Sequence, residues 1–215
     1  RYNMNAVFQY GEKELNYLRK CDGRMAGLIE RFGMIQREVV PDLFTALVGN
    51  IIGQQVSGKA AATIFTRVQN VVKEMQPQSV LAVDNETLRS CGLSQRKVNY
   101  IRAAAEAALD QRLSIERLSQ LSDDELIHVL TELPGVGVWT AEMLMIFSLQ
   151  RPDVLSRHDL IIRRSLCSLY HLPELTREMF EKYRKLFSPY GTVASFYLWA
   201  YGNALTKEEI DRIGK

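Results

Sequence analysis

The segment that most restricts the fold lies at residues 126–147, LIHVLTELPGVGVWTAEMLMIF. Apolar residues recur at three- and four-residue intervals on both sides of the turn at 134–137, which is the spacing of amphipathic helices. Two glycines, Gly135 and Gly137, permit a tight turn that a side chain would obstruct. They also let backbone N–H groups at the start of the second helix approach an anion such as phosphate. The segment predicts a helical hairpin, either an ordinary glycine turn or one that binds an anion.

Helical spacing continues through most of the chain. The segment 44–72, FTALVGNIIGQQVSGKAAATIFTRVQNVV, predicts two helices that meet near residues 54–57. Residues 98–109, VNYIRAAAEAAL, predict an Ala-rich helix. Ser122 and Glu125 form the pattern of a capping box at the start of another helix. Alternating Val/Ile/Thr runs with Asn-Gly or Asp-Gly turns are absent. We therefore predict an all-α protein.

The length, charge and cysteine content of the chain exclude several classes of protein. The chain has 215 residues, enough for one domain or two lobes with a sizeable core. Its 27 basic and 25 acidic residues give a net charge of only +2, so bulk charge does not indicate a nucleic-acid partner. Three widely separated cysteines suit neither a disulfide framework nor a zinc or iron–sulfur site. Without a signal-like start or a membrane-length apolar run, we expect a soluble intracellular protein.

Four sequence blocks resemble the helix-hairpin-helix DNA glycosylase superfamily. LPGVGVWTA at 133–141 resembles the hairpin that grips the backbone of duplex DNA. Asp159, in VLSRHDLIIRRSL, lies about twenty residues further on, at the family's spacing for the catalytic aspartate. The segment 51–65 resembles the family's DNA-probing loop with its flanking helices, and 92–107 resembles the segment between loop and hairpin. The blocks occur in the family's order between about residues 44 and 201.

The resemblance also selects a branch of the superfamily. Bifunctional members carry a nucleophilic lysine in the second hairpin helix, where this chain has Trp139. The four-cysteine cluster of the endonuclease III branch has no counterpart here. Trp139 and Trp199 instead resemble bacterial 3-methyladenine DNA glycosylase II and its short relatives. The resemblance thus implies a hydrolase without lyase activity that excises alkylated purines, of the 3-methyladenine and 7-methylguanine type, in base excision repair.

The resemblance further implies a compact two-lobed fold within a single glycosylase domain at 1–215. We expect one lobe at 36–150, with the hairpin near 126–147, and a second lobe formed by 1–35 and 151–215. Asp159 would face an active-site cleft between the lobes. The implied partner is double-stranded DNA containing alkylated bases, bound by a monomer that needs no cofactor and no membrane. Its location would be the bacterial cytoplasm and nucleoid or the eukaryotic nucleus.

Asp159 is the candidate catalytic residue. A base inside a duplex must be flipped out before an enzyme can act on it. Loss of an alkylated, cationic purine leaves oxocarbenium-like charge on the sugar, which a fixed carboxylate can stabilise while it orients the attacking water. The alternative role of Asp159 is the N-cap of the helix that begins LIIRRSL. Both roles can coexist. Arg157 and His158 are weaker candidates for contacts with the backbone or the water.

The base pocket implied by the resemblance contains Trp139, Trp199 and Met143. Aromatic faces attract a cationic base, and helical spacing puts Trp139 and Met143 on one side of their helix. The alternative for each residue is core packing, which suits Met143 best. A bacterial relative has tyrosines at the positions of Met143 and Ala200. With fewer rings, we expect a weaker cation-binding pocket.

The expected DNA contacts fall on two elements. The loop that would fill the gap left by the flipped base consists of Gln54, Gln55, Val56 and Ser57. The alternative for this loop is a polar corner between two helices. The expected backbone contacts come from Gly135, Val136, Gly137, Thr140 and Lys59.

Two further expectations concern charge around the hairpin. In some relatives backbone carbonyls there hold a monovalent cation, which would here involve Thr131, Leu133 and Val136. Because amides at a helix N-terminus can bind phosphate, few cationic side chains are needed, and the positive face must be local. We predict that this face includes Lys59, Arg96, Lys97, Arg157 and Arg164.

Two other functions remain open from the residues alone. One is a glycosylase for deaminated or mismatched bases, with the same fold and a different pocket. The other is a non-catalytic helix-hairpin-helix module that binds duplex DNA with a steep salt dependence and releases no base.

Overall fold

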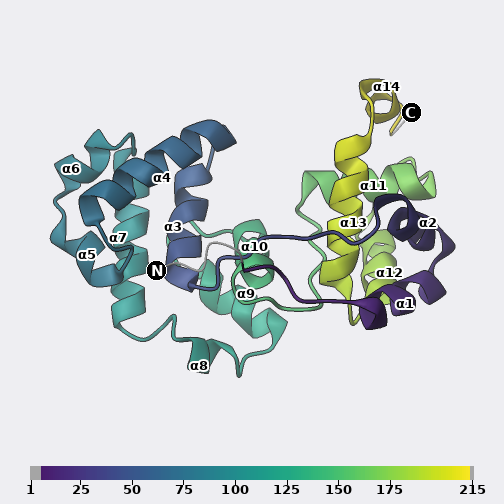
Figure 1. Ribbon diagram of the computed structural model, residues 1–215, viewed down its shortest axis with the longest axis horizontal. Helices are drawn as coiled ribbons and strands as arrows, with labels where there is room; N and C mark the ends of the chain where they lie inside the picture. Colours follow the sequence, from purple (N-terminus) through teal and green to yellow (C-terminus); the bar gives the residue numbers. More distant parts are fainter. Residues whose placement is uncertain (1–5, 214–215) are drawn as a thin grey trace. The chain divides into compact units, whose positions relative to one another are not determined.

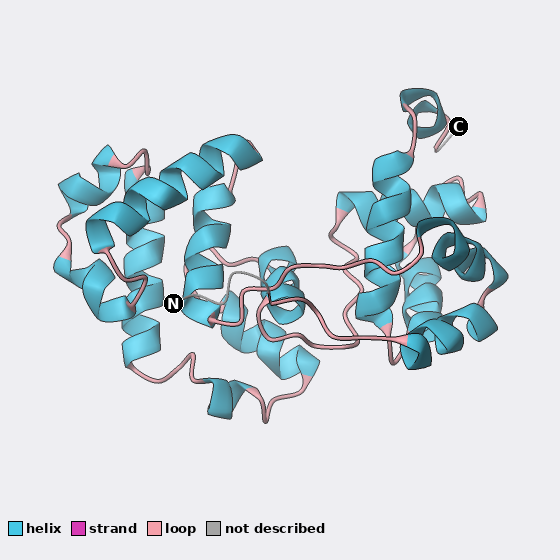
Figure 2. Ribbon diagram, in the orientation of Figure 1, coloured by secondary structure: helices cyan, strands magenta, loops and turns pink. Residues whose placement is uncertain are grey.

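The computed structural model describes residues 6–213 of the chain. Figures 1 and 2 show a chain built from helices and connecting loops. Within the described residues, extended pairing is confined to one antiparallel bridge between Val7 and Glu38. The expectation of an all-α fold is confirmed.

The chain divides into two compact units. The first unit combines residues 1–39 with 150–215, and the second contains residues 40–149. The sequence-based boundary at 36 differs by a few residues from the observed one. Residues 37 and 39 belong to the first unit because their backbone pairs with the N-terminal segment: Phe8 N–H donates to the Arg37 carbonyl, and Val39 N–H donates to the Ala6 carbonyl, both at 2.9 Å.

The unit at 40–149 is organised around one apolar helix. Helix α3 packs against α4, α7 and α10, and buries Leu47, Val48, Ile51 and Ile52 on several of its sides. Apolar side chains lie on several sides of α3, as expected of a helix that is surrounded by other helices. The helices of this unit are α3 (Leu43–Gly53), α4 (Gly58–Val72), α5 (Pro77–Ala82), α6 (Asn85–Ser90), α7 (Gln95–Leu109), α8 (Ile115–Leu118), α9 (Asp123–Thr131) and α10 (Val138–Phe147).

The unit formed by 1–39 and 150–215 is built on a close pair of helices, α11 and α13. Gly202 makes the pair possible, because a Cβ atom there would lie 2.3 Å from Ser165 Oγ and 2.5 Å from Ile161 Cγ2. The Ser165 hydroxyl donates to the Leu198 carbonyl at 2.7 Å. The helices of this unit are α1 (Glu12–Cys21), α2 (Gly23–Phe32), α11 (Leu160–Tyr170), α12 (Arg177–Phe187), α13 (Gly191–Ala204) and α14 (Lys207–Asp211).

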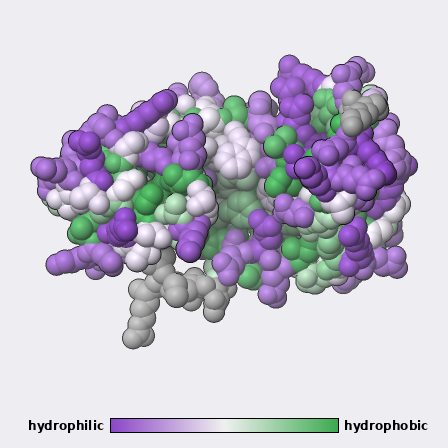
Figure 3. Space-filling model, turned by 90° about the horizontal axis from the view of Figure 1, so that it is seen from above, coloured by the Kyte–Doolittle hydropathy of each residue, from purple (hydrophilic) through white to green (hydrophobic). Residues whose placement is uncertain are grey.

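Charged and polar residues cover most of the face drawn in Figure 3, with smaller hydrophobic patches between them. The most exposed large apolar side chains include Leu160 and Met34 in one unit and Ile115 in the other. Among the described residues, no helix combines the length and the apolar character needed to cross a lipid bilayer.

Candidate functional site

Asp159 is a buried carboxylate at the start of α11. It is only 6% exposed, although its neighbours Arg157, His158 and Leu160 are all exposed. Its Oδ1 atom accepts the Ile162 backbone N–H at 2.9 Å, so the predicted N-cap role is confirmed. The same oxygen accepts the Trp199 indole N–H at 3.1 Å. A helix cap does not require this second donor, which fixes the carboxylate from the neighbouring helix.

Trp199 reaches Asp159 because α13 packs directly on α11. The indole is 5% exposed and stacks on Phe196, with ring centroids 6.3 Å apart and planes inclined by 29°. The guanidinium of Arg37 lies over the indole ring, 5.3 Å from its centroid. Trp199 was predicted as a pocket wall, which stays a prediction. The structure adds a role that the sequence did not suggest, since the indole N–H orients the carboxylate.

The hairpin between α9 and α10 has the predicted form. Gly135 has a φ of +83°, and a Cβ atom there would lie 2.3 Å from the Tyr100 ring. A side chain at this position is therefore excluded twice, by conformation and by space. A Cβ atom at Gly137 would meet nothing within 4 Å, so the fold itself does not demand this glycine. Its absence of a side chain leaves the N-terminus of α10 open to an approaching group.

The N–H groups available at the hairpin begin at Gly137. The Val136 N–H already donates to the Leu133 carbonyl at 3.1 Å within the turn. Gly137 is the N-cap of α10 and makes no side-chain cap bond, and the first N–H groups of a helix have no intrahelical acceptor. Thr140 lies in the first turn and is buried. This end of α10 therefore has the chemistry of a phosphate site, with partial positive charge and N–H donors.

The predicted cation site at the hairpin rests on carbonyl groups. The Leu133 carbonyl accepts one hydrogen bond, from Val136 N–H, and Thr131 Oγ1 donates to the Ile127 carbonyl at 2.7 Å. No group of three or more His, Cys, Asp or Glu side chains in the described part of the chain could hold a metal ion. The role of the Thr131, Leu133 and Val136 carbonyls as cation ligands stays a prediction.

The loop between α3 and α4 has a fixed base and an exposed tip. The side-chain amide of Gln54 donates to the Gly135 carbonyl at 2.8 Å, which ties the loop to the hairpin. Gln55 has a φ of +58° and, like Val56, is exposed at the tip. Ser57 caps α4 through a bond from Ala60 N–H. Of the four predicted loop residues, Gln54 is thus engaged within the protein, whereas Gln55 and Val56 project from it.

Lys97 is bonded to the backbone at the base of this loop. Its ammonium group donates to the carbonyls of Ile52 at 2.8 Å and Gln54 at 2.6 Å. It therefore caps the C-terminal end of α3, where carbonyls carry partial negative charge, and holds the base of the loop. Desolvation by burial lowers the pKa of Lys97. Lys97 thus helps to shape the loop, and its membership of a local positive face stays a prediction.

The other predicted basic residues are placed differently. The Arg96 Nε–H bonds to the Tyr100 hydroxyl, and its guanidinium lies over the Tyr100 ring at 5.5 Å. Arg164 is half-buried on α11. Lys59, in the first turn of α4, and Arg157 are exposed. Contact of these side chains with phosphate stays a prediction.

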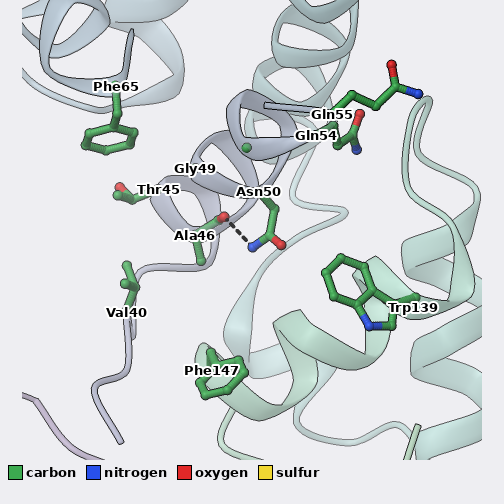
Figure 4. A pocket seen from close by; sticks show the side chains of 11 residues that line it. Val40, Thr45, Ala46, Gly49, Asn50, Gln54, Gln55, Phe65, Trp139 and Phe147 are labelled. Carbon is green, nitrogen blue, oxygen red and sulfur yellow. Dashed lines mark hydrogen bonds between the residues drawn. The ribbon is translucent and has the colours of Figure 1, made fainter. Parts of the chain in front are cut away.

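A pocket of about 560 Å³ lies against α3 in the unit at 40–149. Trp139 lines it and is 44% exposed, whereas Met143 is buried in α10 and does not line it. The placement of Met143 agrees with the core-packing alternative. Figure 4 shows the Trp139 indole and the Asn50 amide directed into the same space, with Gln54 and Gln55 at one end. The walls are mostly apolar.

Asn50, Phe65 and Phe147 line this pocket and were not expected from the sequence. Asn50 Nδ2 donates to the Ala46 carbonyl at 3.0 Å, and its amide is a polar group in the middle of a mainly apolar helix. An asparagine one turn before Gln54 in such a helix was a usable signal. Phe65 and Phe147 carried none, because each reads as an ordinary core residue of its own helix.

Comparison with known proteins agrees with this geometry. Residues 48–189 match the model of the HhH-GPD superfamily of base excision DNA repair proteins. The chain belongs to this superfamily.

Individual relatives and solved structures show which members of the superfamily this chain is similar to. The chain is 37% identical over 161 residues to DNA-3-methyladenine glycosylase 1 of Schizosaccharomyces pombe, covering 73% of this chain and 71% of that protein. It is similar to a crystal structure of DNA-3-methyladenine glycosidase from Bacillus halodurans, with a TM-score of 0.84 and 35% identity over 93% and 94% of the two chains. A 3-methyladenine DNA glycosylase of S. pombe in complex with abasic DNA gives a TM-score of 0.78 and 32% identity, over 91% of this chain and 100% of that one.

Proposed function

We propose that this protein is a DNA glycosylase that removes alkylated purines from duplex DNA and leaves an abasic site. The observation that carries the proposal is the Asp159 carboxylate, buried at a helix N-terminus and held by the Trp199 indole at 3.1 Å in a member of the HhH-GPD superfamily. Relatives named as 3-methyladenine glycosylases support the substrate class. Such a protein acts on chromosomal DNA, in the nucleoid or nucleus according to its source.

The reaction is a hydrolysis at the sugar carbon C1′. Flipping takes the nucleotide out of the stack, at a cost of a few kcal/mol that is smallest for a damaged base. The bond from C1′ to the base nitrogen breaks, and its electron pair leaves with the base, which neutralises the charge that alkylation created. The Asp159 carboxylate stabilises the resulting positive charge on the sugar. Water then forms the new bond to C1′ and loses one proton to the bulk solvent, so that the products are an abasic sugar, the neutral alkylated base and one proton.

The geometry of Asp159 suits the stabilisation of a nearby cation. Its Oδ1 atom is oriented by two N–H donors, the Ile162 backbone and the Trp199 indole. A carboxylate that fixed N–H donors already orient needs little reorganisation when positive charge develops beside it, which is the basis of electrostatic catalysis.

The elements of the other unit provide the DNA-binding parts. The N-terminus of α10, beginning at Gly137, offers N–H donors to a backbone phosphate. Gln55 and Val56 project from the loop between α3 and α4 and would fill the space that the flipped nucleotide leaves. Trp139 offers a partly exposed ring face to the base, and such a face attracts a cation by roughly 0.5–2 kcal/mol.

The absence of lyase activity is part of the proposal. In the bifunctional members of the superfamily that the chain resembles as a whole, a lysine of the second hairpin helix forms a Schiff base with the sugar. Position 139, its counterpart here, carries an indole, which cannot form an imine. Hydrolysis by water is the chemistry that remains to this site.

Release of 3-methyladenine and 7-methylguanine from methylated duplex DNA tests the proposal. The matched variant is Asp159→Asn, because asparagine keeps the size and the N-cap bond and removes only the charge. We expect a loss of about 100-fold or more in the single-turnover rate. Normal base release by this variant would refute the mechanism.

Borohydride trapping tests the absence of lyase activity. We expect no covalent adduct, with a lyase-active glycosylase as positive control. A trapped adduct would contradict the assignment of this protein as a glycosylase without lyase activity.

A further inference from the structure

Arg37 lies over the indole ring of Trp199, whose N–H group donates to the candidate catalytic carboxylate of Asp159. Its guanidinium carbon lies 5.8 Å from the ring centroid of Phe196 and 5.3 Å from that of Trp199. The two rings stack on each other, and the Trp199 N–H donates to Asp159 at 3.1 Å. A cation, two rings and a carboxylate therefore form one continuous arrangement within the unit that contains Asp159.

The backbone of Arg37 is held in place independently of this contact. Its carbonyl accepts the Phe8 N–H, and the Val39 N–H donates to the Ala6 carbonyl, each at 2.9 Å. The Phe8 ring meets Phe196 edge-on, with centroids 5.2 Å apart. The guanidinium thus extends from a paired segment onto a fixed aromatic stack.

The environment of Arg37 is costly for a charged group. The residue is partly buried, and desolvation lowers its pKa. Arginine nevertheless stays protonated at neutral pH, and a partly desolvated guanidinium binds an aromatic face more strongly than an exposed one.

We propose that Arg37 is a positioning residue for base excision: by its contact with the Trp199 ring it fixes the direction in which the indole N–H holds the Asp159 carboxylate. The inference rests on the proposed function, since it assigns Arg37 to the same reaction. A reacting group displaced by about 1 Å loses up to 100-fold in rate, so a group that sets the angle of the indole affects the rate without touching DNA.

The first test separates chemistry from binding. Arg37→Met removes the charge and keeps an unbranched chain over the rings. We expect the single-turnover rate of 7-methylguanine release to fall about 10-fold, while the Kd for duplex DNA containing a tetrahydrofuran abasic analogue changes less than twofold. A matching loss in Kd would make Arg37 a phosphate ligand, and an unchanged rate would remove its role; either result overturns the proposal.

The second test asks whether Arg37 acts through Trp199. Trp199→Phe keeps an aromatic ring and removes the N–H donor. In that background we expect Arg37→Met to reduce the rate less than twofold further, because the bond that Arg37 directs is already gone. A full, additive 10-fold loss would show that Arg37 acts independently of the indole, contrary to the proposal.

Two controls guard against an effect on folding alone. Arg31 also lies over a ring, that of Phe32 at 4.9 Å, in the same unit, and Arg31→Met is expected to leave the rate unchanged. Arg37→Lys keeps a cation and is expected to recover at least half of the lost rate on a logarithmic scale. If Arg37→Met does not fold, Arg37→Lys takes its place. Its loss in single-turnover rate is then measured in the wild-type background and in the Trp199→Phe background, and the difference between the two losses gives the coupling. Additive losses in that pair would again overturn the proposal.

Tryptophan fluorescence can also detect the contact between Arg37 and Trp199. The chain has two tryptophans, so Trp139→Phe leaves Trp199 as the sole source of indole fluorescence. Arg37→Met in that background is expected to change the emission spectrum, and an unchanged spectrum would show that the contact is absent in solution. The failures are distinguishable: a wild-type protein that releases no base refutes the proposed function, whereas active wild type with an active Arg37→Met variant refutes only this inference.

Discussion

The two units of the molecule hold their candidate functional groups in different ways. The unit containing Asp159 buries its key group and fixes it with side-chain contacts between α11 and α13. The unit containing the hairpin exposes its key groups and shapes them through backbone conformation, with positive φ at Gln55 and Gly135. The first arrangement suits a charge that must not move during a reaction, and the second suits surfaces that must approach another backbone closely.

The comparison predicts the largest effect at Asp159. Asp159→Asn should abolish most base release and leave the Tm close to that of the wild type, because asparagine also caps a helix. Asp159→Ala should lose activity to the same degree and in addition about 1 kcal/mol of unfolding free energy, through loss of the cap. Single-turnover assays and denaturant unfolding separate the two losses. Equal stability of the two variants would contradict the role of the cap bond to Ile162.

The hairpin should respond to backbone change where the catalytic unit responds to loss of charge. Gly135→Ala meets both an unfavourable φ and the Tyr100 ring, so we expect a loss of about 1–3 kcal/mol in unfolding free energy and about 10-fold weaker duplex binding. Gly137→Ala has open space for its Cβ atom and should cost little stability. Its effect should fall on DNA affinity alone, measured as Kd at fixed salt. Equal destabilisation by both variants would contradict the assigned geometry.

The loop should show a division between its base and its tip. Lys97→Met removes the cap on α3, and we expect base excision to fall about threefold to tenfold because Gln54 and the tip lose their support. Gln55→Ala, at the exposed tip, should slow excision by reducing the stability of the flipped state, without a change in Tm. Thermal melts with a 2-aminopurine flipping assay distinguish them. A drop in Tm for Gln55→Ala would place that residue in the fold instead.

The smallest effect is expected at Asn50. Its amide is a polar group in the apolar pocket beside Trp139, so Asn50→Leu should change the preference among alkylated bases about twofold to threefold and leave duplex affinity unchanged. Competition between 3-methyladenine and 7-methylguanine release measures this ratio. Asn50→Asp is the matched polar variant. An unchanged ratio in both variants would mean that the pocket does not contact the base.

Sequence patterns predicted the elements well because they are local. Helical spacing, the Ser122 capping box and the glycine turn depend on neighbours within a few residues, and each is present in the structure. The resemblance predicted the superfamily, which is confirmed, and the residue type predicted the cap role of Asp159, which is also confirmed. The catalytic role of Asp159 stays a prediction. Lys97 shows the limit of this reasoning. A lysine beside a predicted DNA-binding loop reads as a phosphate ligand, and only the approach of α7 to the end of α3 turned it into a cap.

The amino-acid sequence by itself determined the helices, the hairpin with its required glycine at 135, and a carboxylate at the start of α11, because each follows from short-range sterics and capping. Tertiary structure alone decided which groups meet. Trp199 lies 40 positions from Asp159, and Arg37 lies more than 100 positions from both rings that it covers. These contacts depend on how closely helices pack, as at Gly202, and no local pattern in the sequence records that distance.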